Sequence, residues 1–352
     1  MGRLGCNPLD ATADTESPAM RVIIRVDIGA EHGMGHAVRC RALAQTLATR
    51  GVEVRFVTRT PALAIFVAPF SCTIRNLGPL EDGDILLFDH KSDFPVYPWR
   101  QLMRHAGLRL VCIDPESTDP SWNLSIFPNA HQSQTLLDRG QREVGERLLA
   151  GWDYVMLAPD VTQQTPLSYD QRQNGPIVFC AGGSDPTGAL EQMYQWATQY
   201  PFPVPLPGLL VFLIGASATG NLRKDYDIAG QSQLHIGKTS IEPFSLERLR
   251  DATLLVTTFG QTCYEALWNQ TPALCLARTP EEAAEVQALS ARTGGAVRLL
   301  GVQRQGEPTH FYDALTTLWR DVATRHQMSA ASAGLFDGKG IDRVAEAVLG
   351  LG

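Results

Sequence analysis

Short apolar runs alternate with amphipathic stretches along the first half of the chain. The β-branched run 22–27 is typical of a buried parallel strand, and a glycine-containing loop follows it at 29–35. Apolar residues then recur at three- and four-residue spacing from Cys40 to Leu47, which predicts a helix ending near Gly51. Because further strand-like runs lie at 52–57, 85–88 and 108–113, the order of elements predicts a parallel, doubly wound sheet.

A second alternation of the same kind begins after a polar stretch with the composition of a linker. Its strand-like runs lie at 177–180, 209–214, 254–257 and 273–276. We therefore expect an α/β protein with two Rossmann-like domains of similar size. The expected organisation is a disordered extension at 1–20, an N-terminal domain at 21–158, a linker at 159–176, a C-terminal domain at 177–340, and a C-terminal helix and tail at 341–352.

Composition narrows the class of protein. The 352 residues carry a formal net charge of −7 without a basic run, which disfavours binding to nucleic acid or to an anionic membrane. The seven cysteines form no C-x-x-C pair, so neither a disulfide framework nor a metal site is expected. No stretch reaches the roughly 18 apolar residues of a membrane-spanning helix, and residues 1–20 lack the apolar core of a signal peptide. We expect a cytoplasmic protein, and its oligomeric state stays open.

The first candidate site is the loop that follows the first strand. Arg25 and Asp27 lead into Gly33, Gly35 and His36 at the expected start of a helix. Glycines let backbone N–H groups approach a ligand, and a helix N-terminus favours an anion. In open α/β sheets ligands bind beyond the carboxyl ends of the strands, where this histidine is well placed for proton transfer. An ordinary tight turn with an exposed histidine is the alternative.

Two loops of the second half have similar chemistry. The first runs from a strand into Gly182, Gly183, Ser184 and Asp185, which suits phosphate binding or an ordinary strand-to-helix turn. The second comprises Thr258, Gly260, Gln261 and Thr262, with Glu265 in the helix that begins there. This glutamate either complements the helix dipole or accepts the hydroxyls of a ribose.

Three ionisable groups follow strands of the first half. Asp89 and His90 end one strand-like run, and Asp114 ends the next. Because the carboxyl ends of parallel strands share one sheet edge, these residues favour a ligand-binding cleft at that edge. Taken singly, each is a common type of loop residue.

Several motifs in a fixed order resemble the PseG family, the UDP-2,4-diacetamido-2,4,6-trideoxy-β-L-altropyranose hydrolases of pseudaminic acid biosynthesis, which are related in fold to MurG-type GT-B glycosyltransferases. The resemblance extends from about residue 21 to 350. The motifs are Arg25-x-Asp27, Gly33-x-Gly35-His36-x-x-Arg39-Cys40, Asp89-His90, Gly182-Gly183-Ser184-Asp185-Pro186, Glu265-Ala266-Leu267 and Asp337-Gly338-x-Gly340-x-x-Arg343-Val344.

The resemblance implies a GT-B fold with a nucleotide sugar between the two domains. It implies that His36 acts on the attacking water, with Asp27 or Asp89 as orienting groups. Glu265 would bind the nucleotide, and the loops 182–185 and 258–262 would surround the diphosphate. The sugar and phosphate loop would include Arg25, Gly33, Gly35, Arg39 and His90, and no metal or other cofactor is required.

The leading interpretation is a hydrolase that releases UDP from a deoxy-amino sugar. The chain departs from the family pattern at Lys91, Pro115, Ala158 and Val286, which lie near the sugar side of the expected cleft. A GT-B glycosyltransferase with a UDP-sugar donor and a sugar-nucleotide-binding protein without enzymatic activity therefore stay open as alternatives. The apolar segment 63–70 is a candidate membrane-facing patch, but we interpret it as a buried helix.

Overall fold

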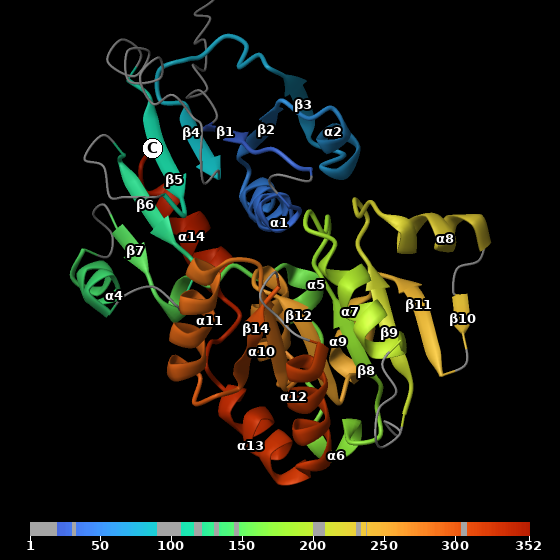
Figure 1. Cartoon of the computed structure of the whole chain (residues 1–352). Helices are drawn as coiled ribbons and strands as arrows, with labels where there is room; N and C mark the ends of the chain where they lie inside the picture. Colours follow the sequence, from blue (N-terminus) through green and yellow to red (C-terminus); the bar gives the residue numbers. More distant parts are fainter. Residues whose placement is uncertain are drawn as a thin grey trace, which may run out of the picture.

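Aliphatic residues that are buried on both faces of their strands build two mainly parallel sheets. In β1 (Arg21–Arg25), Val22 and Ile24 pack in the same core as helix α1, whereas Ile23 packs on the opposite face. Figure 1 shows the computed structural model, which describes residues 20–29, 33–89, 107–115, 122–129, 134–143, 148–199, 208–229, 234–236, 238–303 and 308–352.

The first sheet has the strand order β3-β2-β1-β4-β5-β6-β7, and its neighbouring strands all run parallel. This order places β1 and β4 at the centre, so the loops that follow them meet at the middle of the carboxyl edge. The other strands are β2 (Glu53–Thr58), β3 (Ser71–Ile74), β4 (Ile85–Asp89), β5 (Arg109–Ile113), β6 (Leu124–Phe127) and β7 (Leu148–Ala150).

The second sheet has the order β10-β11-β9-β8-β12-β13-β14, and β10 alone of these strands runs antiparallel to its neighbour. Its central strands β8 and β12 lead into the glycine-containing loops predicted to bind phosphate. The strands are β8 (Ile177–Cys180), β9 (Leu210–Ile214), β10 (Leu234–Ile236), β11 (Thr239–Pro243), β12 (Leu254–Thr258), β13 (Ala273–Ala277) and β14 (Val297–Val302).

Helices connect the strands of both sheets. In α1 (Gly35–Thr49), the predicted apolar face is fully buried at Cys40, Leu43 and Leu47. The N-terminal half also contains α2 (Ala62–Phe66) and α4 (Gln134–Arg142), and the stretch predicted as linker contains α5 (Pro159–Thr162) and α6 (Tyr169–Arg172). The C-terminal half contains α7 (Ala189–Gln199), α8 (Asn221–Ala229), α9 (Leu246–Asp251), α10 (Gln261–Trp268), α11 (Pro280–Arg292), α12 (Pro308–Arg320), α13 (Val322–Ser332) and α14 (Gly340–Leu349).

The last helix returns to the N-terminal sheet. In α14, Ile341, Val344 and Val348 are buried in the same core as β1 and α1, and Figure 1 shows this helix beside the first sheet. A side chain at Gly340 would overlap the carbonyl oxygen of Val155, so the two segments that cross between the sheets are in direct backbone contact. The chain therefore passes twice between the sheets at one place.

The two-domain architecture and the parallel sheets confirm the expected fold class, while the proposed domain limits stay predictions. Strands β3, β6, β7, β10 and β11 were not predicted, because they are short or polar, and the six-residue, mainly apolar β14 was also missed. The interpretation of 63–70 as a buried helix is wrong in part: α2 ends at Phe66, and Ile65 is 84% exposed. The expected disordered extension lies outside the described residues, apart from Met20. Among the described helices, none is long and apolar enough to span a membrane.

Candidate active site between the two sheets

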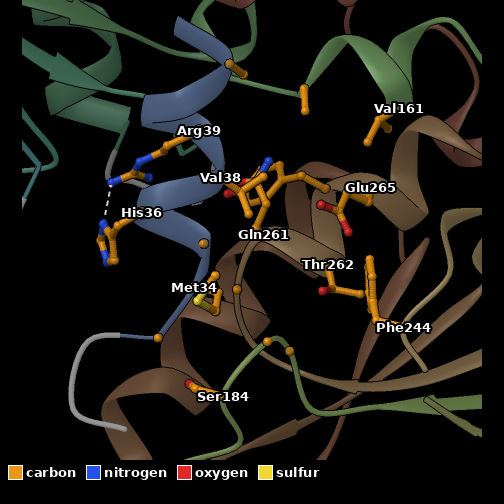
Figure 2. Close-up of a pocket in the computed structure, with 18 of the residues that line it drawn as sticks. Met34, His36, Val38, Arg39, Val161, Ser184, Phe244, Gln261, Thr262 and Glu265 are labelled. Carbon is orange, nitrogen blue, oxygen red and sulfur yellow. Dashed lines mark hydrogen bonds between the residues drawn. The ribbon is translucent and has the colours of Figure 1, made fainter. Parts of the chain in front are cut away.

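A cavity of about 770 Å³ lies between the carboxyl edges of the two sheets. It falls in the size range of small-molecule sites, and both halves of the chain contribute to its wall. Figure 2 shows its centre, where His36 and Arg39 lie on one side of α1 and Val38 lies on the other, toward Gln261 and Glu265. A ligand that reaches both sides must pass the first turn of α1.

On one side of α1, His36 forms a dyad with Asp89 at the end of β4. Its Nδ1 lies 2.6 Å from Oδ1 of Asp89, and an ionised carboxylate accepts but does not donate. Nδ1 therefore carries a proton and donates a hydrogen bond to Asp89. The ring lines the cavity and its side chain is 21% exposed, so it is accessible to a ligand.

Asp89 is held by three side chains of α1. Its carboxylate accepts two hydrogen bonds of 2.6 Å from Arg39 and a weaker one of 3.3 Å from Cys40, in addition to that from His36. Burial opposes ionisation of Asp89, but the charge of Arg39 and the hydrogen bonds from Arg39 and His36 outweigh it and hold the pKa of this carboxyl well below its usual value. Asp89 is thus a fixed anion behind the imidazole.

Asp27 forms a separate buried ion pair at the end of β1. Arg25 donates to both of its oxygens, at 2.6 and 2.5 Å, and Thr58 and the backbone N–H of Arg59 also donate to it. Burial works against ionisation, but these donors lower the pKa of Asp27 to about 2. Asp27 lines the cavity, whereas Arg25 is buried behind it. The predicted contact of Arg25 with a sugar or phosphate therefore finds no support in its position.

The start of α1 packs closely on the C-terminal domain. A side chain at Gly183 would overlap Met34, and one at Gly35 would lie 3.4 Å from Cβ of Gln261. Ser217 donates to the sulfur of Met34 at 3.4 Å. Glycine is therefore required at 183 for this contact, and the loop before α1 meets the glycine loops of the second sheet.

The residues of the loop after β8 have two different roles. Gly182, Gly183 and Ser184 line the cavity. Asp185 instead points into the start of α7, where it accepts from the backbone N–H groups of Ala189 at 2.7 Å and Leu190 at 3.0 Å. The structure thus gives Asp185 the role of a helix cap and does not bring it to the cavity.

Glu265 lies on the other side of α1, in the second turn of α10. Its side chain is buried, and its Oε2 atom has no hydrogen-bond partner within the described residues. Burial, together with the nearby charge of Asp160, raises the pKa of Glu265 to about 7. A buried carboxyl in the wall of a cavity is a ready acceptor for ligand hydroxyl groups.

Several lining residues were not predicted. Arg278 follows β13 and pairs with Glu282 in the first turn of α11, also donating its backbone N–H to that carboxylate at 2.8 Å. Phe244 follows β11 and is 36% exposed, although it is aromatic and lies at the cavity. For Arg278, the available signal was a charged residue shortly after a predicted strand. The strand before Phe244 was not predicted, so no signal in the sequence pointed to this residue.

Most of the predicted site residues line this one cavity. They are Asp27, Gly33, Gly35, His36, Arg39, Asp89, Gly182, Gly183, Ser184, Thr258, Gly260, Gln261, Thr262 and Glu265. Arg25 and Asp185 are directed elsewhere, and His90 lies outside the described residues. In the part of the chain that the structure describes, no cluster of three or more histidine, cysteine, aspartate or glutamate residues is arranged to hold a metal ion.

Comparison with known proteins places the chain by fold alone. No protein-family model and no curated protein sequence matches it. Acinetobacter baumannii MurG is 14% identical, with a TM-score of 0.57 over 94% of this chain and 99% of that one. The UDP-GlcNAc 2-epimerase of Neisseria meningitidis, bound to UDP-GlcNAc, is 12% identical, with a TM-score of 0.54 over 94% and 100%.

A third similar structure is the spinosyn rhamnosyltransferase SpnG complexed with thymidine diphosphate. It is 16% identical, with a TM-score of 0.56 over 92% of this chain and 96% of that one. These matches span nearly the whole of each chain. This chain has two Rossmann-like domains of mainly parallel strands that face one cavity, and these proteins match it over nearly their full length. The chain therefore has the GT-B fold.

Proposed function

We propose that this protein binds a nucleoside-diphosphate sugar in the cavity and cleaves the bond between the anomeric carbon and the diphosphate. One observation carries the proposal: a His36–Asp89 dyad and the buried carboxyl of Glu265, one oxygen of which has no hydrogen-bond partner among the described residues, line the same cavity from opposite sides of α1. The first supplies a base, and the second supplies an acceptor for the hydroxyls of a ribose.

The helix ends between these residues suit the diphosphate. Gly35 begins α1 and Gln261 begins α10, and neither helix has a side-chain cap among the described residues. Their first N–H groups and the positive ends of their dipoles therefore favour an anion. This matters because Arg39 and Arg278 are already paired with carboxylates and because the whole chain is negative. Backbone dipoles would provide much of the attraction for phosphate.

The ligand then has a defined direction. The nucleoside would lie on the Glu265 side, near Phe244, and the sugar would lie on the His36 side, near Asp114. Support for a nucleotide also comes from the neighbours of the same fold, whose complexes include UDP-GlcNAc and thymidine diphosphate. A carboxylate that accepts two ribose hydroxyls favours a uridine over a thymidine nucleotide, because the latter lacks the 2′-hydroxyl.

The proposed reaction is hydrolysis. Nε2 of His36 takes a proton from water as its oxygen bonds to the anomeric carbon, while the bond to the diphosphate oxygen breaks and its electron pair leaves with UDP. The imidazolium that forms beside Asp89 later loses its proton to solvent. Helix dipoles at the diphosphate stabilise the negative charge that develops on the leaving group. The motifs shared with the PseG family make its UDP-deoxy-amino sugar the first substrate to test.

Glycosyl transfer is the second candidate, because the neighbours with this fold include a rhamnosyltransferase. The same base would then act on an acceptor hydroxyl in place of water. The test is to incubate the purified chain with a panel of UDP- and thymidine-diphosphate sugars, with and without acceptors, and to measure the free nucleotide. UDP released in water, and lost in His36→Ala, supports hydrolysis, whereas release only with an acceptor supports transfer. Absence of nucleotide binding would refute both.

A further inference from the structure

Arg39 was expected to contact the sugar or phosphate; it lines the cavity, and its guanidinium is paired with a carboxylate. Its guanidinium is nearly fully buried, and it donates through Nε and one terminal nitrogen to the two oxygens of Asp89, both at 2.6 Å. The same terminal nitrogen lies 3.9 Å from a carboxylate oxygen of Asp114 at the end of β5. A fork of this kind fixes both the position and the plane of a carboxylate.

These paired hydrogen bonds determine which oxygen of Asp89 accepts a hydrogen bond from His36. Oδ1 accepts from Arg39 and from His36, and Oδ2 accepts from Arg39 and from Cys40, so the carboxylate is saturated and cannot rotate without losing several bonds. Nδ1 of His36 also lies 3.0 Å from a terminal nitrogen of Arg39. The ring nitrogen is thus between an acceptor and a donor, and its protonation depends on which of them dominates.

The geometry favours Asp89. Its oxygen is closer to Nδ1 than the guanidinium nitrogen is, at 2.6 against 3.0 Å, and a bare lone pair on Nδ1 would face a lone pair of the carboxylate. The guanidinium also balances the charge of Asp89, which is buried completely. Without this balance, the buried anion would hold a second proton on the imidazole, and Nε2 would lose its lone pair.

We propose that Arg39 is a positioning residue for the reaction: its paired hydrogen bonds fix Asp89 as the acceptor for Nδ1–H of His36 and keep the ring neutral, with a lone pair on Nε2. This inference rests on the proposed function, in which His36 is the base. The charged groups around the ring are Arg39 on α1, Asp89 after β4 and Asp114 after β5, and the Arg278–Glu282 pair lines the same cavity from the C-terminal domain.

The first test needs no substrate. ¹⁵N spectra of the full chain labelled at histidine distinguish the two neutral forms of the ring from the imidazolium, and His36→Asn identifies the signals of His36. At pH 7.5 we expect a neutral ring with its proton on Nδ1. In Arg39→Gln, the Nε2 signal should move into the range of a protonated nitrogen, whereas Arg39→Lys, which keeps the charge, should keep the ring neutral and mix the two tautomers.

The second test uses the rate of UDP release. Arg39→Gln should lower kcat by about 100-fold or more, the usual size of general-base catalysis, while the Kd for UDP changes less than twofold. Arg223→Gln removes a half-buried arginine that pairs with Asp227 on α8 and should change neither value. If Arg39→Gln does not fold, the unaltered protein and Arg39→Lys still decide the question.

Two results would overturn the inference. One is a proton on Nε2 in the unaltered protein, and the other is an Arg39→Gln protein that keeps both the neutral Nδ1–H ring and the original rate. A failure of the proposed function is distinguishable from these, because it would appear as an absence of nucleotide release from the unaltered protein. The state of the ring is measured independently of turnover.

Discussion

Replacing Glu265 with glutamine changes the charge at the nucleoside end of the cavity and keeps the shape of the side chain. In the structure this carboxyl is buried, and one of its oxygens has no hydrogen-bond partner among the described residues. Burial makes the ionised form costly, and the pKa rises from 4.5 to about 7. The substitution therefore removes a group that destabilises the empty fold whenever it is ionised.

The magnitude follows from the difference between the folded and unfolded states. A shift of about 2.5 pH units corresponds to about 3 kcal/mol. Below pH 4.5 the carboxyl is protonated in both states, and the full stability is present. Between pH 4.5 and 7 the unfolded chain releases the proton first, so the free energy of unfolding falls by up to about 1.4 kcal/mol per pH unit. Above pH 7 the whole loss has occurred.

Urea unfolding of the ligand-free protein at pH 4.5, 6, 7 and 8 measures this difference. Trp268, which ends α10, gives a fluorescence signal close to the substituted residue. Relative to the unaltered protein, Glu265→Gln should gain about 3 kcal/mol between pH 4.5 and 8. Two pH profiles that stay parallel across this range would refute the reasoning, because they would show that Glu265 does not titrate abnormally.

Nucleotide binding should show the opposite dependence. Two ribose hydroxyls donate best to an ionised carboxylate, so binding below pH 7 must release the proton of Glu265. The affinity for UDP should therefore fall by about tenfold per pH unit below 7. Glu265→Gln should bind UDP about 10- to 100-fold more weakly at pH 8, since hydrogen bonds to charged groups contribute about 1.5–3 kcal/mol. Calorimetry in two buffers of different ionisation enthalpy counts the released proton. Unchanged affinity in the variant would exclude the proposed ribose contact.

Three further changes test other parts of the structure. Gly183→Ala should weaken nucleotide binding and change the thermal midpoint little, because the new methyl group displaces Met34 from the contact between domains. An affinity equal to that of the unaltered protein would show that this contact is unimportant for binding. Asp27→Asn should destabilise the protein by about 2 kcal/mol above pH 4, and the loss should disappear as the pH falls towards 2, where the unaltered carboxyl is also protonated. Arg172→Met should lower the free energy of unfolding by about 3 kcal/mol, since it leaves the backbone carbonyl of Asn269 and other buried acceptors unpaired; a loss below about 1 kcal/mol would mean that water or rearrangement replaces them.

The sequence was most informative where a strand is buried on both faces. Runs such as 85–88 and 177–180 are continuous aliphatic segments, and they coincide with β4 and β8. The polar strands β3 and β11 gave no such signal, because one lies at a sheet edge and the other carries threonine, serine and glutamate. Their place in the sheets is decided by neighbouring strands and not by their own pattern.

The site was predictable as a set of loops but not as a set of contacts. The alternation of strands and helices brings Gly33, Gly182 and Gly260 to one cavity, because each follows a central strand of a parallel sheet. The partners of each side chain depend on packing that the sequence does not record. Thus Asp185 caps a helix, and Arg39 pairs with the carboxylate of Asp89.

The return of α14 has a consequence for how this protein is made. Its buried residues, among them Val344 and Val348, complete the core that begins at Val22. A ribosome delivers the first sheet early, yet the apolar surface under α14 stays uncovered until residues 340–349 have also been synthesised. The first sheet therefore completes its core only after the second sheet has been made, and removing residues 340–349 would destabilise the N-terminal half of the molecule.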